Sequence, residues 1–303
     1  MAGMAEGDLY AVDPAVRASV LGTRPILVHL LEGYIDAGQV GHQVREALEG
    51  LGPLEPLARF DHDALHDYRS RRPQMIFDQN TWLEMDDPDL VLSRATDAEG
   101  RAFLLLTGPE PDMRWRATLS AVLDLAEDLG ASELVTVHGI PMAVPHTRPT
   151  LVTGHATDPD RAPGNPVWID RVTVPGSFSA ALEFLAGRRG LFARGFVAHV
   201  PHYLAAGTYA PAALAVLERI REATGLALPP GDLAARSLST LAQLEGEVSG
   251  DGELGPLVTA LEEQYDDLVA GGGRSVPSAD EIGAAIERFL AEHDDEGDPG
   301  GSH

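Results

Sequence analysis

Short apolar runs alternate with helical patterns over about residues 25–225, and this alternation restricts the fold more than any other feature of the sequence. The run "RPILVHLLEGY" at 24–34 is bounded by Pro25 and Gly33, and its length is typical of a buried strand. Apolar residues then recur at helical spacing, with Asp36 in the N-cap position, until "GP" at 52–53 ends the pattern. Alternation of this kind indicates an α/β domain whose mainly parallel sheet carries helices on both faces.

The remaining core elements follow the same logic. Further strands are predicted at 56–60, 73–78, 89–97, 101–108, 133–140, 150–158, 167–174 and 195–200. The turn "AEG" between 89–97 and 101–108 predicts a hairpin, which would make the sheet mixed rather than wholly parallel. Helices are predicted at about 112–129, with Asp112 as its N-cap, and at 176–190 and 210–225.

Strand patterns stop near "LPP" at 228–230, and this change sets the expected domain organisation. We expect an α/β core domain over 1–230 and a helical C-terminal extension over 231–293. Within that extension, helices are predicted at 232–247, 253–270 and 279–293. The last segment, 294–303, reads "DDEGDPGGSH" and is expected to be a disordered acidic tail.

Composition excludes several function classes. The chain has no cysteine and no lysine, which removes thiolate nucleophiles, cysteine-ligated zinc, Schiff-base chemistry and a P-loop. Its net charge of −25 has the wrong sign for binding nucleic acid. With no apolar stretch of roughly 18 residues and no signal-peptide pattern at the start, the expected setting is cytoplasmic, without membrane contact.

Polar side chains gather where the predicted strands end, which is where ligands bind in α/β sheets. We call them the strand-end residues and treat them as a candidate pocket or subunit interface: Asp36, Glu110, Asp112, His138, His146, Arg148, His199, His202 and Tyr203. If the strands are parallel neighbours, these residues line one edge of the sheet.

Each chemical reading of the strand-end residues has a structural alternative. No histidine spacing specifies a metal site, so neither a metal nor another cofactor is predicted. The glycines of "EGYIDAGQVG" at 32–41 match no phosphate-binding motif, and a tight turn is favoured. Ser177 in "PGSFS" reads as a helix N-cap, because the stretch fails the nucleophile pattern GxSxG. The negative charges of Glu110 and Asp112 are favourable near the N-terminus of a helix, although general acid–base catalysis remains the alternative role. No catalytic residue is therefore assigned.

The stretch "VHGIPMAVPHTRPT" at 137–150 carries the same ambiguity. Pro141 and Pro145 fix the backbone of the loop. His146 and Arg148 are expected to lock it, by bonds to loop carbonyls or from Arg148 to Glu110 or Asp112. A ligand-binding role is the alternative.

Six motifs occur in order along the chain: "EGYIDAG", "DYRSRRP", "LLLTGPEPDMRW", "GIPMAVPHTRP", "VPGSF" and "AHVPHYLA". Together they resemble the actinobacterial branch of the proteasome assembly chaperone family, of the second-chaperone type, over about residues 8–270. The resemblance implies a three-layer α/β/α unit around a mixed sheet, similar to the purine nucleoside phosphorylase-like fold. It also implies self-association, with a trimer preferred, and proteasome subunits as candidate partners. It implies no catalytic residues.

Two functions follow from these observations. The first is a non-enzymatic, homo-oligomeric chaperone or adaptor; the alternative is a small-molecule enzyme or sensor for a nucleoside-like or phosphorylated ligand. Some archaeal members of the family dock through a hydrophobic-Tyr-X tail, and docking by that route is not expected for a sequence ending "DDEGDPGGSH". An open pocket around Glu110, His146, Arg148 and His199 would favour the enzyme.

Overall fold

The computed structural model describes residues 9–86, 89–162, 171–248 and 254–270, and within them a single large sheet dominates. Its eight strands lie in the order β1-β3-β6-β7-β2-β8-β10-β9. The strands are β1 (Tyr10–Val12), β2 (Ile26–Glu32), β3 (Glu55–Phe60), β6 (Val91–Thr96), β7 (Ala102–Pro109), β8 (Glu133–Met142), β9 (Val152–Ala156) and β10 (Ala193–Pro201). The central four, β7-β2-β8-β10, are parallel, whereas β6 and β9 flank them in the antiparallel sense.

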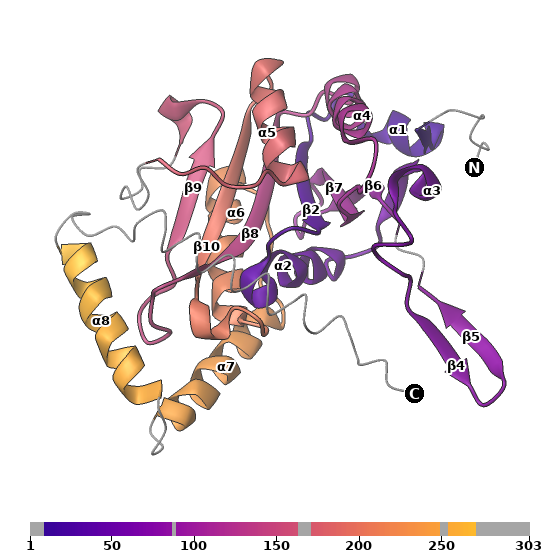
Figure 1. The fold of residues 1–303 in the computed structure, drawn as a ribbon. Helices are drawn as coiled ribbons and strands as arrows, with labels where there is room; N and C mark the ends of the chain where they lie inside the picture. The colour runs from indigo at the N-terminus through magenta and orange to yellow at the C-terminus, as the bar shows by residue number, and fades with distance from the viewer. Residues whose placement is uncertain (1–8, 87–88, 163–170, 249–253, 271–303) are drawn as a thin grey trace.

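The helices cover both faces of this sheet (Figure 1). One face packs against α2 (Val40–Glu49), α6 (Ala210–Thr224) and α7 (Leu233–Val248). The other packs against α1 (Pro14–Val20), α3 (His62–Leu65), α4 (Trp115–Asp128) and α5 (Phe178–Arg188). These three layers confirm the predicted α/β class with a mixed sheet, while the likeness to purine nucleoside phosphorylases stays a prediction.

Strand β2 shows why its sequence reads as a continuous apolar run. Ile26, Val28 and Leu30 point into the layer of α2 and α6, while Leu27 points into the layer of α4 and α5. Both faces of the strand are therefore buried, because it lies in the middle of the sheet with a helical layer on each side.

Several predicted elements need correction. The predicted strand at 73–78 does not join the sheet: Met75–Asp78 forms β4, which pairs with β5 (Thr81–Met85) in a separate hairpin. This hairpin projects away from the body of the molecule (Figure 1). Residues 171–174 of the predicted strand 167–174 are not in a strand, and 167–170 lie outside the described residues. The hairpin predicted at 89–108 is confirmed as β6 and β7.

The C-terminal helices attach to the core at two places. Leu233 and Leu244 of α7 belong to the same hydrophobic cluster as α2 and α6. Helix α8 (Leu254–Ala270) instead packs through Tyr265 against Met142, the last residue of β8, and Val144, in the loop that follows. The predicted helices at 232–247 and 253–270 are thus confirmed, whereas the predicted helix at 279–293 and tail at 294–303 lie outside the described residues. The division into an α/β core and a helical extension stays a prediction.

No helix in the described part of the chain combines the length and the apolar character needed to cross a membrane.

Candidate functional site

Most of the strand-end residues follow strands of the parallel sheet, in separate local networks, whereas His138 and His199, expected after the strand ends, lie within β8 and β10. The first surrounds Asp36, which follows β2. Its Oδ1 accepts hydrogen bonds from the amides of Gly41 (2.8 Å) and Gly139 (3.1 Å), and its Oδ2 accepts one from the amide of His42 (3.1 Å). Burial nevertheless raises the pKa of the Asp36 carboxyl. The N-cap residue of α2 is Gln39 and not Asp36 as predicted, but the Asp36 side chain accepts two amides from the first turn of α2 and also fastens it to β8.

This junction leaves no room for a side chain at position 139. A Cβ on Gly139 would lie 2.0 Å from the carbonyl oxygen of Ala37. On the other side of Asp36, Gly38 and Gln39 both have left-handed backbone angles, with φ values of 67° and 51°. The turn after β2 is therefore tight. The Asp36 carboxylate accepts hydrogen bonds from the Gly41 and His42 amides, which have no partner within the helix.

The second network lies beyond the end of β7 and contains Glu110. Its Oε1 accepts a hydrogen bond from the amide of Phe178 (2.8 Å), the first residue of α5. A Cβ on Gly33 would lie 2.5 Å from Oε2, so the loop after β2 passes directly over the carboxyl group. Burial raises the pKa of Glu110. The residue therefore supports the start of α5, where Ser177 is the N-cap, as predicted.

Asp112 belongs to the same region but does not cap α4. The residue before α4 is Arg114, in a left-handed conformation, and it makes no side-chain capping bond. Asp112 instead accepts hydrogen bonds from the Asp67 amide and from Arg71, which lies 2.8 Å away, and its Oδ2 lies 3.5 Å from the Nδ1 of His66. Burial alone would raise the pKa of Asp112, but the Arg71 and Asp67 hydrogen bonds outweigh it and lower the pKa.

His138 and His199 lie on the α5 side of β8 and β10. The Nε2 of His199 is 2.9 Å from the hydroxyl of Thr153 on β9. Burial lowers the pKa of each histidine to about 4, so both are neutral at pH 7. His29 of β2 belongs with them, since burial lowers its pKa to about 3. His29 was not singled out from the sequence, because a histidine inside an apolar run carries no motif.

The third network joins the loop after β8 to the end of β10. The Nδ1 of His146 lies 2.7 Å from the Tyr203 hydroxyl, and the His146 amide donates to the same oxygen (3.1 Å). Since that oxygen accepts from the amide, its own proton is available to Nδ1. The ring of His202 packs edge-on against Tyr203. These contacts hold the loop at 143–149 against the turn that follows β10, whereas Pro141, expected in the loop, is part of β8.

The fourth network connects Arg148 to α8. Arg148 donates to both carboxylate oxygens of Asp266 (2.9 and 2.7 Å) and to Glu262 (2.9 Å). The Asp266 hydrogen bonds, together with Glu262, raise the pKa of Arg148 further above its usual range. The hydroxyl of Tyr265 donates to the carbonyl of Pro149 (3.0 Å). The expected partners Glu110 and Asp112 are therefore wrong, because α8 lies closer to this loop.

The missed partners did leave a signal in the sequence. Glu262, Tyr265 and Asp266 are spaced as neighbours on one face of a helix, and a guanidinium beside an aromatic ring and two carboxylates forms a stable contact. What the sequence lacks is any indication that α8 turns back over the strand ends.

Four surface hollows formed by described residues are lined throughout by side chains other than the strand-end residues. Within the same residues, no group of three or more histidines and carboxylates is placed to hold a metal ion. As far as the structure describes them, the strand-end side chains hold loops and helices in position.

Comparison with known proteins identifies the family. Residues 30–248 match the PAC2 family profile. The chain belongs to the PAC2 family. None of the curated protein sequences matches it.

Several solved structures are similar to this chain over most of its length. The Mycobacterium tuberculosis protein Rv2714, of unknown function, is 36% identical with a TM-score of 0.81, covering 89% of this chain and 93% of its own. A Corynebacterium glutamicum protein of unknown function is also 36% identical, with a TM-score of 0.80, covering 86% and 98%. The M. tuberculosis proteasome-assembly chaperone homologue Rv2125 is 26% identical with a TM-score of 0.70, covering 77% and 99%.

Proposed function

We propose that this PAC2 protein is a non-enzymatic, cytoplasmic, homo-oligomeric chaperone or adaptor that binds proteasome subunits. The observation that carries the proposal is the similarity to Rv2125, described as a proteasome-assembly chaperone homologue, over 77% of this chain. A chaperone role is also compatible with the six sequence motifs, to which no catalytic residue was assigned.

The strand-end networks support a binding role over catalysis. The carboxylates of Asp36 and Glu110 accept hydrogen bonds from backbone amides, and the guanidinium of Arg148 donates to carboxylates on α8. A general acid, a general base or an electrophilic clamp needs a group that faces the substrate. The small-molecule enzyme or sensor is the weaker candidate for that reason.

The β4–β5 hairpin supports self-association. Six large apolar side chains of the hairpin are between 45% and 60% exposed: Met75, Ile76, Phe77, Trp82, Leu83 and Met85. An isolated two-stranded hairpin is marginally stable in water, and exposed apolar patches of this kind mark protein contacts. A second copy of the chain is the partner we propose for it, and an arm that reaches from each copy to the next closes into a ring such as a trimer.

Binding to proteasome subunits is tested directly with purified components. The full chain is mixed with free α subunits, with free β subunits and with assembled α rings, and complexes are detected by native mass spectrometry. We expect a saturable complex with one of these species. If none of the three binds at micromolar concentration, the chaperone proposal is overturned.

The alternative function has its own readout in a thermal-shift screen with nucleosides, nucleotides and sugar phosphates. The chaperone proposal expects a flat screen. A concentration-dependent rise in Tm that His146→Ala abolishes would move the assignment to a small-molecule enzyme or sensor.

A further inference from the structure

The β4–β5 hairpin is acidic as well as apolar. Residues 75–86 include Asp78, Glu84 and Asp86 and contain no basic residue. All three acidic residues are exposed, and none forms an ion pair with another described residue. A surface that receives the hairpin therefore needs positive charge next to apolar side chains.

A basic region lies at the base of the same hairpin, where residues 65–72 pack against residues 110–116. The amides of Asp112 and Met113 both donate to the carbonyl of Leu65, at 2.9 and 3.0 Å. The two segments together hold five arginines and three carboxylates, in a chain whose net charge is −25. Positive charge is thus concentrated at this place.

Most of these arginines have no partner in the described part of the chain. Arg71 pairs with Asp112, and the three carboxylates already accept hydrogen bonds from within the chain. The other four arginines are exposed and form no ion pair with the described residues. Together with two exposed apolar neighbours they make up what we call the root surface: Tyr68, Arg69, Arg72, Met113, Arg114 and Arg116.

The charges of the root surface do not serve the helix that carries two of them. Arg114 precedes α4 and Arg116 lies in its first turn, where positive charge is unfavourable for a helix. The first turn contains no acidic residue that would compensate. These guanidinium groups are therefore available to a partner.

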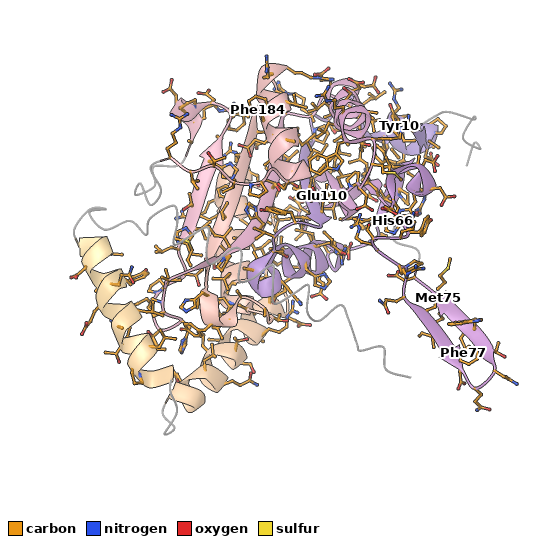
Figure 2. All side chains as sticks on the ribbon, in the orientation of Figure 1. Tyr10, His66, Met75, Phe77, Glu110 and Phe184 are labelled. Atoms are coloured by element: carbon orange, nitrogen blue, oxygen red, sulfur yellow. The ribbon has the colours of Figure 1, made fainter. Side chains whose placement is uncertain are left out.

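The hairpin does not pair with its own root surface. Figure 2 shows His66 close to the point where the hairpin leaves the body, and Met75 and Phe77 farther out along the hairpin. Among the described residues, no ion pair joins an acidic residue of the hairpin to an arginine of the root surface. A second copy of the chain carries both complementary surfaces.

We propose that the β4–β5 hairpin of one copy docks on the root surface of the next copy. Its carboxylates meet the arginines, and its exposed aromatic rings lie against Tyr68 and Met113. The inference rests on the self-association proposed above and adds the surface that receives the hairpin. Because hairpin and root surface are different patches, each copy gives one hairpin and receives one, and such a contact can close into a ring.

The test reverses the charges on each side of the contact and measures mass by size-exclusion chromatography with light scattering. Arg114→Glu with Arg116→Glu is the root variant, and Asp78→Arg with Glu84→Arg is the hairpin variant. Each brings like charges together, so we expect the protein concentration at half assembly to rise at least about tenfold. The chain with all four substitutions has opposite charges again, and we expect it to recover most of the assembly of the parent chain.

Two controls separate the contact from unfolding and from net charge. Glutamate is favourable at the start of α4, so the root variant is expected to fold like the parent chain. Arg188→Glu with Arg219→Glu makes the same change in net charge on α5 and α6, and we expect it to leave assembly unchanged.

The outcomes distinguish this inference from the proposed self-association. An oligomeric parent chain overturns the inference alone if the root variant keeps its mass, if the control has an equal effect, or if the four substitutions together do not restore assembly. A parent chain that is monomeric at all concentrations overturns both.

Cross-linking identifies the surfaces that meet, because the chain has no cysteine of its own. Leu83→Cys labels the hairpin, Met113→Cys labels the root surface, and a short bismaleimide joins them. We expect a covalent dimer only when the two variants are mixed. A dimer of Leu83→Cys alone would show that hairpins meet each other, and a link within one chain carrying both cysteines would show that the hairpin folds back on its own root; either result overturns the inference.

Discussion

Asp36 illustrates, at the scale of a single residue, how much of the strand-end geometry depends on one buried group. Its carboxylate accepts three backbone N–H groups, two from α2 and one from β8. Asp36→Ala leaves these donors without a partner, and each unsatisfied buried donor costs about 1–3 kcal/mol. We expect the free energy of unfolding in urea to fall by at least about 2 kcal/mol.

Asp128→Ala is the control, because its bonds to Arg17 are exposed. Surface pairs of this type contribute about 0–1 kcal/mol. Equal effects of Asp36→Ala and Asp128→Ala would contradict the role assigned to Asp36.

The buried histidines predict an acid-sensitive fold. The pKa values of His29, His138 and His199 are lowered to about 3, 4 and 4, whereas an unfolded histidine titrates near 6.5. Below pH 6.5 the unfolded chain therefore binds protons that the folded chain does not. Stability contributed by these groups is complete above about pH 6.5 and is lost as the pH falls toward 4, by up to ~1.4 kcal/mol per histidine per pH unit.

Unfolding in urea at pH 7.5, 6 and 5 checks this prediction. Carboxylates with lowered pKa values, such as Asp112, also reduce stability as the pH falls. The dependence of the unfolding free energy on pH is therefore compared between a histidine variant and the parent chain. We expect His29→Gln to have a shallower dependence on pH than the parent chain. An unchanged slope would show that His29 does not titrate as its burial requires.

Sequence reasoning at the residue scale succeeded where a role depends on neighbours along the chain. Ser177 is the N-cap of α5 as predicted, and Asp36 accepts amide hydrogen bonds from the first turn of α2, although Gln39 is the N-cap residue there. Asp112 and Arg148 were given wrong partners, because their real ones, Arg71 and Asp266, come from distant segments. His29 was missed, since its burial depends on position in the sheet.

At the scale of elements, α8 is held to the core by few contacts, and Arg148 provides most of the polar ones. Its bonds to Glu262 and Asp266 join α8 to the loop after β8. We expect Arg148→Gln to increase amide hydrogen exchange in α8 several-fold, because the carboxylates lose their cation. Raising the salt concentration produces a similar increase in the parent chain, since screening weakens an exposed pair.

Exchange is followed by mass spectrometry on peptides from 254–270. Arg219→Gln on α6 serves as the control and leaves α8 unchanged, because Arg219 pairs only with Glu222 among the described residues. Equal exchange in Arg148→Gln and the parent chain would mean that the buried side chains of α8 and the Thr147–Glu262 hydrogen bond fix the helix without Arg148.

The predicted elements divide by their hydrophobic pattern. Strand β2 is a continuous apolar run and helix α4 carries a long apolar stripe at helical spacing, and both were predicted with the correct type. The short β1 and α1 were not predicted, because three strand residues and seven helix residues carry little periodicity. The strand at 73–78 exists, but its alternation could not reveal that it pairs only with β5, outside the large sheet.

At the scale of the whole molecule, the projecting hairpin is the feature that predicts the assembly state. Phe77 and Trp82 face each other across β4 and β5 with ring centroids 4.8 Å apart, and both are more than half exposed. We expect the parent chain to be oligomeric, with a trimer preferred, by size-exclusion chromatography with light scattering. Phe77→Ser with Trp82→Ser removes the apolar contact and shifts the mass toward the monomer.

Leu238→Ser is the matched control, because Leu238 is 71% exposed and belongs to α7, a helix that lies away from the β4–β5 hairpin (Figure 1). A parent chain that is monomeric at all concentrations, or a double variant with unchanged mass, would exclude the hairpin as the contact between copies.

The strand order also has a consequence for synthesis on the ribosome. Strand β2 is translated early, but its partners in the sheet come much later: Leu27 pairs with Leu104 on β7, and His29 pairs with Thr136 on β8. At about 5–20 residues per second, an apolar strand leaves the exit tunnel several seconds before either neighbour exists. The nascent chain is therefore prone to aggregation during that interval. A protein that we propose to be a chaperone thus needs a holdase chaperone of its own while it is being synthesised.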